Sequence, residues 1–421
     1  THALEYLQQS LTIRKQLLGE SHLDVATSYN NIGSIYYSQG DYTHALEYLQ
    51  QSLTIRKQLL GESHLDVATS YNNIGSIYYS QGDYTHALEY LQQSLTIRKQ
   101  LFGESHPDVA TSYDNIGCVY GSQVDYAHAL EYLQQSLAIR KQLLGESHPD
   151  VATSYNSIAG VYDSHGDYTH ALEYYQKSLV IFKQVFGDFH PDVATSYDNI
   201  GCVYHSQGDY THALEYHQKS LTIRKQVLGE SHPDIAFSYN NIGSVYDSQG
   251  DYTRALEYYQ QSLTIRKQVF GESHPDIALS YNNIGYIYSD QGDYSRALEY
   301  YQQSLAIWKQ VYGESHPDVA LSYNNIGVVY NAQGDYNRAV EYFQQSLTIR
   351  KQVYGESHPK VATSYNNIGA VYRAQGDYAR ALEYYQQALD IRKQALGQEH
   401  PDTKDTQENI EKILQKLNEE K

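Results

Sequence analysis

The chain repeats one 42-residue sequence about ten times, and this repetition constrains its fold more than any other feature. Residues 1–42 recur without a change as residues 43–84. Asp24 recurs at this spacing through eight copies, Lys360 takes its position in the ninth, and Asp402 opens a shorter final copy. A fixed period of this length is typical of chains in which each repeat packs on its neighbours. We therefore expect one elongated core rather than several globular domains.

The apolar pattern within one repeat predicts two helices. The first helix has a face formed by Val67, Tyr71, Ile74 and Tyr78, spaced at helical intervals. The second has a face formed by Ala87, Leu88, Leu91 and Leu95. Between them, Gly82 suits the left-handed position that ends a helix, and Asp83 suits the N-cap of the next one. The sequence therefore predicts an all-α chain of antiparallel helix pairs.

These residues resemble the signature of the tetratricopeptide repeat. The matching positions are Tyr71, Ile74, Gly75, Tyr78, Ala87, Leu91 and Ser94. The 42-residue period and the linker Leu-Gly-Glu-Ser-His-Pro-Asp resemble the kinesin light chain type of this repeat. The resemblance implies a right-handed superhelical α-solenoid of about nine full repeats plus terminal half-repeats.

The domain organisation follows from the same pattern. We expect a solenoid over residues 1–400, with a partial repeat at 1–22 and full repeats starting near residues 24, 66, 108, 150, 192, 234, 276, 318 and 360. Residues 401–421 lose the Tyr/Gly pattern and are expected to form a charged capping helix. Because the chain begins inside a repeat and has no Met, we expect it to be a piece of a longer protein.

Composition argues against several classes of partner. The formal net charge is −19, with 49 acidic and 30 basic residues, which disfavours nucleic acid and anionic membranes. No apolar run reaches the 18 residues of a membrane-spanning helix. Cys118 and Cys202 lie two periods apart, too far for a disulfide, so a reducing, cytoplasmic location is expected.

No catalytic, metal or cofactor site is predicted. The recurring Ser-His-Pro-Asp segment, as at Ser105–Asp108, contains triad-type residues, but it lies at a helix start without an oxyanion site. The linker histidines are spaced by roughly the distance between neighbouring helices, about 10 Å, so they cannot share a metal ion. Phosphate-binding and dinucleotide-binding glycine motifs are absent.

The resemblance places the first helix of each repeat along a concave groove that binds extended peptides or helices. Asparagines recur on the predicted groove face: Asn72, Asn73, Asn115, Asn199, Asn240, Asn241, Asn282, Asn283, Asn324, Asn325, Asn366 and Asn367. An amide offers both donors and an acceptor, so these residues could hold a peptide backbone whatever its sequence. Alternatively, they hydrogen-bond a neighbouring helix.

Three other groove positions vary between repeats. Apolar side chains gather at Phe237, Leu279, Leu321, Tyr286 and Val328, which predicts a pocket for a hydrophobic anchor. The alternative is that they fill gaps between helices. The apolar residues occupy two of these positions, and the third includes His205, Asp247 and Arg373. Selection for a ligand and drift at exposed sites both explain the variation at the third position.

Charge on the predicted groove suggests the kind of peptide. The acidic residues expected there are Asp114, Asp163, Asp198, Asp247 and Asp290, against the single basic residue Arg373. The resemblance to kinesin light chains implies basic groove residues for acidic cargo, and this chain lacks them. A neutral or basic peptide is therefore the expected ligand.

Some repeats depart from the pattern. Val124 replaces the turn glycine, which predicts a reshaped and weaker turn. His217 takes an apolar packing position, and Phe182 and Trp308 replace an arginine of the second helix. These two aromatic residues are surface contacts or unremarkable exposed side chains.

The sequence thus predicts a non-enzymatic scaffold that binds a protein or peptide. One alternative is a structural or regulatory solenoid of a larger signalling protein, whose groove is filled by other domains of the same chain. A third is an array selected for copy number without a fixed ligand, suggested by the two identical first copies.

Overall fold

The computed structural model describes residues 2–419, which form twenty α-helices and no strand. The chain starts with α1 (His2–Leu18) and ends with α20 (Pro401–Glu419). The first helices of the repeats are α2 (Leu23–Ser38), α4 (Leu65–Ser80), α6 (Pro107–Ser122), α8 (Pro149–Ser164), α10 (Pro191–Ser206), α12 (Pro233–Ser248), α14 (Pro275–Asp290), α16 (Pro317–Ala332) and α18 (Pro359–Ala374). The second helices are α3 (Tyr42–Leu60), α5 (Tyr84–Phe102), α7 (Tyr126–Leu144), α9 (Tyr168–Phe186), α11 (Tyr210–Leu228), α13 (Tyr252–Phe270), α15 (Tyr294–Tyr312), α17 (Tyr336–Tyr354) and α19 (Tyr378–Leu396).

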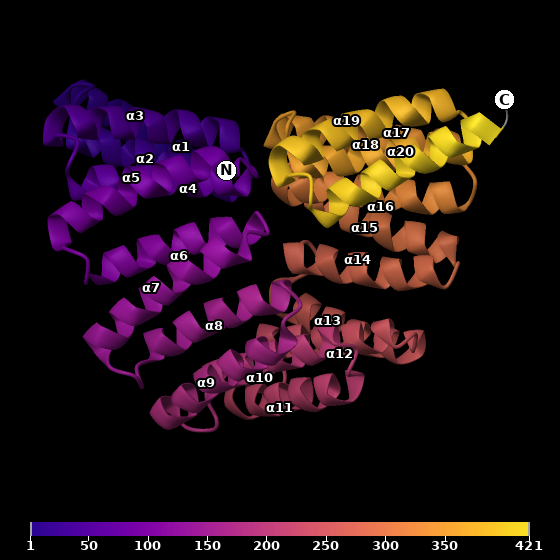
Figure 1. The fold of residues 1–421 in the computed structure, drawn as a ribbon, viewed down its shortest axis with the longest axis horizontal. Helices are drawn as coiled ribbons and strands as arrows, with labels where there is room; N and C mark the ends of the chain where they lie inside the picture. The colour runs from indigo at the N-terminus through magenta and orange to yellow at the C-terminus, as the bar shows by residue number, and fades with distance from the viewer. Residues whose placement is uncertain (1, 420–421) are drawn as a thin grey trace. The chain divides into compact units, whose positions relative to one another are not determined.

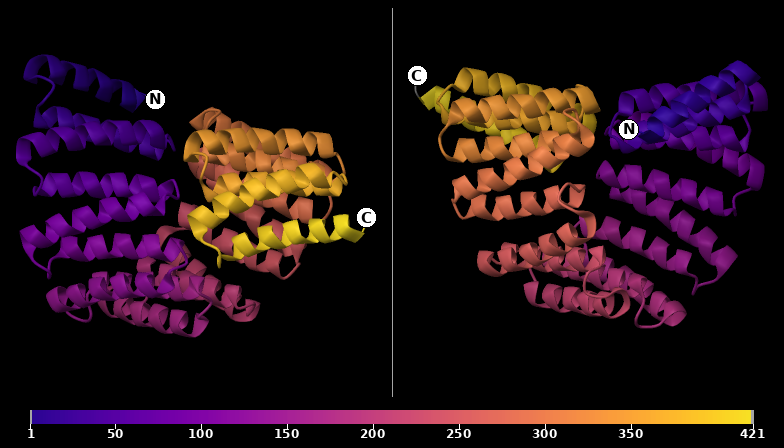
Figure 2. Two further views of the ribbon diagram at one scale, coloured as in Figure 1. Left: turned by 45° about the horizontal axis from the view of Figure 1, so that its top comes forward. Right: turned by 180° about the vertical axis from the view of Figure 1, so that it is seen from behind.

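The helices form an α-solenoid in which successive pairs pack side by side (Figures 1 and 2). The chain divides into two compact units. Unit 1 comprises Thr1–Tyr132, Ser315–Asn324 and Tyr336–Lys421, and unit 2 comprises Leu133–Glu314 and Asn325–Asp335. The predicted all-α repeat architecture is confirmed.

The linker histidine has a structural role that the sequence analysis missed: it is the N-cap of the first helix. His64 has an extended backbone, and its Nδ1 accepts a hydrogen bond from the Asp66 backbone N–H at 3.1 Å. The same bond recurs at His22, His106, His148, His190, His232, His274, His316, His358 and His400. Each ring therefore satisfies a backbone donor that a helix start leaves free.

The two helices of a repeat approach closely because glycine occupies the contact. A Cβ on Gly75 would lie 2.9 Å from Leu91 Cγ and 3.2 Å from the Ala87 carbonyl oxygen. Ile74 and Leu91 are almost fully buried beside it. A side chain here would push the pair apart, which explains why the signature places glycine at this position.

In most repeats, an arginine of the second helix binds the next repeat. Arg56 is 9% exposed, and its Nη1 donates to Ser70 Oγ at 2.8 Å and to the Asp66 carbonyl oxygen at 3.2 Å. Phe182 takes the place of this arginine between α9 and α10. It is only 5% exposed, so the expectation of a surface contact was wrong there: its ring is buried in the junction.

The turn at Val124 keeps the geometry of the glycine turns. Val124 has a φ of 65°, and the Asp125 N–H bonds the Tyr120 carbonyl oxygen at 3.0 Å, as Asp83 bonds Tyr78 at 2.9 Å. The predicted reshaping is therefore wrong, and the β-branched residue adopts the left-handed conformation instead. That conformation carries a steric penalty of ~1–2 kcal/mol for a residue with a Cβ.

Candidate functional site

The exposed side of the first helices carries the candidate residues, and we call it the first-helix face. In α12 the side chains of Ile235, Ile242 and Val245 are buried against neighbouring helices. Because a helix turns by about 100° per residue, Phe237 and Asn241 lie on the opposite side. All twelve predicted asparagines are partly exposed there.

The asparagines form an interrupted ladder between repeats. Each bond runs from the Nδ2 of the second asparagine in one repeat to the Oδ1 of the first asparagine in the preceding repeat. In unit 1 the donor–acceptor pairs are Asn73–Asn30 (3.1 Å), Asn115–Asn72 (2.8 Å) and Asn367–Asn324 (2.8 Å). In unit 2 they are Asn283–Asn240 and Asn325–Asn282, both 2.7 Å.

The ladder uses part of the hydrogen-bonding capacity of these amides. Each side-chain amide has two N–H donors and an acceptor oxygen with two lone pairs. Each ladder bond uses one N–H of one amide and one lone pair of the other. Asn156 Oδ1 and Asn366 Oδ1 are buried without a partner among the described residues. The asparagines therefore join successive repeats.

Asp198 does not lie on the first-helix face as expected, because it turns into the core. It is 3% exposed and occupies the position of the first asparagine. Its Oδ1 lies 2.9 Å from His217 Nδ1, while its Oδ2 accepts from Ser220 Oγ at 2.8 Å and Arg224 Nη1 at 2.6 Å. We call these four residues the Asp198 cluster. They explain why a histidine can replace an apolar residue at position 217.

Large apolar side chains are exposed on the first-helix face of unit 2. The exposed fractions are 47% for Phe237, 42% for Leu279, 50% for Tyr286 and 44% for Val328. Leu321, also 42% exposed, lies in the part of α16 that belongs to unit 1. They are not part of the buried core, and the pocket for a hydrophobic anchor stays a prediction.

Carboxylates also lie on the first helices of unit 2, and two of them, Asp247 and Asp290, lie near Tyr286. Burial raises the pKa of Asp247 to about 6, and the neighbouring Asp290 carboxylate adds to the shift. Burial also raises the pKa of Asp163. The Tyr252 hydroxyl donates to Asp290 Oδ2 at 3.0 Å, and Asp290 raises the pKa of Tyr286. The face thus combines exposed apolar groups with partly desolvated negative charge.

The remaining predicted residues contact the next repeat. His205 Nε2 lies 2.7 Å from Ser248 Oγ, and burial, followed by the charge of His217, lowers the pKa of His205. Arg373 Nη1 donates to Asn409 Oδ1 at 3.0 Å. Tyr79 makes an equivalent bond to Ser122 at 2.9 Å. This variable position therefore bridges repeats as well as facing solvent.

The histidines, carboxylates and cysteines are the remaining candidates for a chemical site. No group of three or more His, Cys, Asp or Glu among them could hold a metal ion. Cys118 and Cys202 are free. Burial, with Asp198 and Asp163, raises the pKa of the Cys202 thiol to about 11, which disfavours a reactive thiolate. None of the helices described is both long and apolar enough to cross a bilayer.

A sequence model of the tetratricopeptide repeat matches the chain in ten overlapping segments, from residues 1–58 to residues 360–420. The chain belongs to the tetratricopeptide-repeat family. Members of this family are generally non-catalytic scaffolds that bind proteins or peptides. The chain matches none of the curated proteins with which it was compared.

Several solved structures are similar to parts of the chain. BtubC (BKLC) from P. vanneervenii is 26% identical with a TM-score of 0.45, covering 56% of this chain and 92% of that one. A Podosopora anserina protein described as a kinesin light chain with nearly identical TPR-like repeats is 23% identical with a TM-score of 0.41, covering 49% and 97%. The signal transduction ATPase PH0952 from Pyrococcus horikoshii, with a tetratricopeptide repeat sensor, is 14% identical with a TM-score of 0.47, covering 84% and 52%.

Proposed function

We propose that the array is a non-enzymatic adaptor that binds a protein segment on the first-helix face of unit 2, and that this segment is basic with a hydrophobic anchor. The observation that carries this proposal is the exposed Tyr286 beside the carboxylates of Asp290 and Asp247, on a face that also exposes Phe237 and Leu279. Burying the apolar side chains would supply affinity, and the carboxylates would select the charge of the partner.

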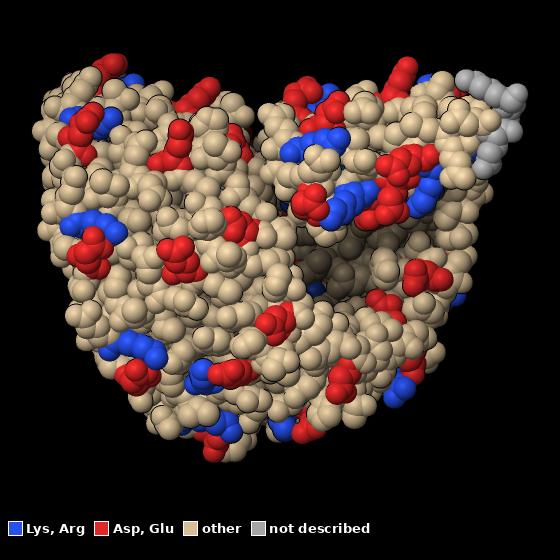
Figure 3. All heavy atoms as spheres, viewed as in Figure 1, with Lys and Arg blue, Asp and Glu red and all other residues tan. Residues whose placement is uncertain are grey.

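Charge also supports a protein partner over nucleic acid. The net charge is −19, and acidic and basic side chains are interspersed on the face drawn in Figure 3. Polyanion binding relies on a basic footprint. The two free cysteines fit a reducing compartment, so we propose a cytoplasmic location.

The asparagines serve the same function in this proposal. Ladder bonds such as Asn283 to Asn240 orient the amides along successive helices, and the unused N–H and C=O groups would bind the backbone of an extended segment. Backbone contacts give sequence-independent affinity, while the apolar and acidic side chains give specificity.

A peptide-display selection tests the proposal with two libraries of equal hydrophobicity, one basic and one acidic. The informative variant is Phe237→Thr/Leu279→Thr, because threonine occupies this position in other repeats, as at Thr153 and Thr195. The control is Val269→Thr, which removes an exposed apolar side chain from the second helix α13.

We expect the native array and the control to enrich basic peptides with an aromatic or aliphatic anchor, and the double variant to lose at least tenfold in affinity. Affinity should also fall as the pH drops through about 6, because protonated Asp247 no longer attracts a cation. Enrichment of acidic peptides would contradict the proposal. If neither library is enriched, the regulatory solenoid with a groove filled by its own chain becomes the better account.

A further inference from the structure

Two glycine turns near the N-terminus contact two histidine linkers near the C-terminus, all within unit 1. A Cβ on Gly82 would lie 2.7 Å from His358 Nε2 and 3.4 Å from Pro359 Cδ. A Cβ on Gly40 would lie 3.2 Å from Pro317 Cδ and 3.4 Å from His316 Cδ2. In both pairs the histidine follows the glycine by the same number of residues, so the contact is in register with the repeat.

These contacts distinguish the four segments from their other copies. The turn glycines Gly166, Gly208, Gly250, Gly292, Gly334 and Gly376 have nothing within 4 Å of an added Cβ. The His316 side chain is 10% exposed, whereas the equivalent side chain of His274 is 38% exposed. His358 is 8% exposed. The glycine turn and the His-Pro linker are therefore open in the other repeats but covered at Gly40, Gly82, His316 and His358.

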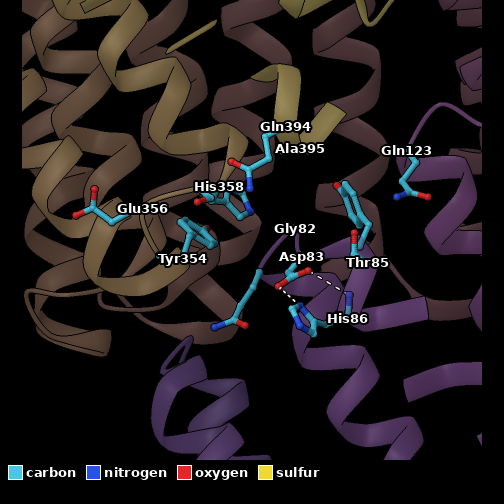
Figure 4. A pocket seen from close by; sticks show the side chains of 14 residues that line it. Gly82, Asp83, Thr85, His86, Gln123, Tyr354, Glu356, His358, Gln394 and Ala395 are labelled. Carbon is cyan, nitrogen blue, oxygen red and sulfur yellow. Dashed lines mark hydrogen bonds and ion pairs between the residues drawn. The ribbon is translucent and has the colours of Figure 1, made fainter. Parts of the chain in front are cut away.

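Aromatic and polar groups complete the contact. Helix α17 packs against α3, and the Tyr42 and Tyr354 ring centroids lie 6.0 Å apart. Tyr354 stacks on His358 at 4.3 Å, and both face the turn at Gly82 (Figure 4). Beside them lies a cavity of about 510 Å³ that Asp83, His86 and Gln123 line from the other side.

The one exception to the recurring aspartate lies in this contact. Lys360 replaces the aspartate that every other full repeat has at this position. Its Nζ donates to Tyr354 Oη at 3.1 Å, and its charge lowers the pKa of Asp318, although burial raises that pKa overall. An aspartate at position 360 would place a second carboxylate beside Asp318, where like charges repel in a partly desolvated site.

We propose that Gly40 and Gly82, docked on the His-Pro linkers 316–317 and 358–359, form a latch that holds the first and last repeats of unit 1 together, and that Lys360 specifies it. Because Gly40 and Gly82 have no Cβ, the histidine and proline rings of the linkers can pack against their backbone. Lys360 removes the charge repulsion that the consensus aspartate would create. Two neighbouring linkers that both carry the consensus aspartate would present the same surfaces without the positive charge of Lys360.

A distance measurement between the N-terminal and C-terminal segments of unit 1 tests the latch. Nitroxide labels at Thr43→Cys and Glu356→Cys, both exposed positions, are introduced into the full chain with Cys118→Ser and Cys202→Ser. Pulsed electron spin resonance then gives the distribution of distances. Circular dichroism checks that each variant is helical.

Three substitutions separate the latch from general effects on folding. Gly82→Ala adds a methyl group against His358, whereas Gly166→Ala imposes the same left-handed strain (φ +79° against +74°) with no neighbour within 4 Å. Lys360→Asp restores the residue of the other repeats, so the repeat itself should fold. We expect a short, narrow distribution for the parent and for Gly166→Ala, and a longer, broader one for Gly82→Ala and Lys360→Asp.

The latch is overturned if the parent already gives a long, broad distribution, or if Gly82→Ala and Gly166→Ala behave alike. An unchanged distribution in Lys360→Asp would overturn the role of Lys360. The peptide-binding face lies on other residues, so failure of either test leaves the proposed function standing.

Discussion

His217 Nδ1 lies 2.9 Å from Asp198 Oδ1 in the core, with the two side chains 1% and 4% exposed. In the second full repeat the same two positions hold Asn72 and Leu91. The two departures from the repeat pattern therefore compensate each other: the carboxylate gives the histidine a partner, and Arg224 balances its charge.

The Asp198 cluster should be cooperative. Asp198→Ala leaves Arg224 and His217 buried without the carboxylate, and we expect it to lower the local free energy of unfolding by about 3–5 kcal/mol. The double variant Asp198→Asn/His217→Leu recreates the pair found at Asn72 and Leu91, so it should be less damaging. Hydrogen exchange of α10 and α11 measures both. If the double variant exchanges faster than Asp198→Ala, the two residues do not compensate each other.

Replacing Val124 by glycine should stabilise the turn between α6 and α7. Val124 adopts a φ of 65°, and removing its Cβ should relieve about 1–2 kcal/mol of steric penalty. The matched opposite change is Gly166→Val, which should destabilise α8 and α9 by a similar amount. Amide exchange at the two turns reports both effects. Equal exchange in Val124→Gly and the parent would show that the valine is not strained.

The arginine between repeats should be replaceable by an aromatic residue but not by alanine. Arg266 is 5% exposed and donates to Ser280 Oγ at 2.7 Å. Arg266→Ala removes these bonds and the packed side chain, at about 1–3 kcal/mol. Arg266→Phe should cost less, because Phe182 fills the equivalent junction. Thermal and urea unfolding rank the variants, and an equal loss in both would contradict this expectation.

The latch should open in acid. Burial, followed by the charges of Lys360 and Arg350, lowers the pKa of His358 to about 3, against about 6.5 for an exposed histidine. The latched state therefore binds fewer protons, and the contribution of His358 is complete above about pH 6.5 and is lost as the pH falls towards 3. Asp318 acts in the opposite direction, because burial raises its pKa, but the drop in the pKa of His358 is large.

The spin-label distances measured from pH 7.5 to 4.5 check this expectation. The mean distance should increase as the pH falls. His358→Asn retains an N-cap acceptor and should flatten the pH profile. A parent profile that is already flat would contradict the role of His358.

Much of the fold follows from local pattern. The spacing of Val67, Ile74 and Tyr78, the turn at Gly82 and the N-cap Asp83 predict the pair α4 and α5, because helix periodicity and capping depend on neighbouring residues. The exposed apolar residues Phe237 and Leu279 were also predictable from their positions. The Val124 turn was not, because the packed helices on either side impose its geometry.

The candidate site was predictable only in outline. Asparagine pairs and variable positions mark the first-helix face, but their hydrogen bonds depend on a partner one repeat away. Asp198 shows the limit: the repeat pattern places it on the exposed face, yet His217 and Arg224 of the next helix draw its carboxylate inward.

By itself, the sequence determined the repeat length, the helix pairs, their caps and the identity of the exposed residues, since these depend on short-range periodicity and backbone chemistry. Only the tertiary structure decided which copies of identical segments are in contact. Gly82 and Gly166 have the same local sequence signal, but only Gly82 meets a histidine. Such a contact depends on how packing brings distant repeats together in space, and no local pattern contains that information.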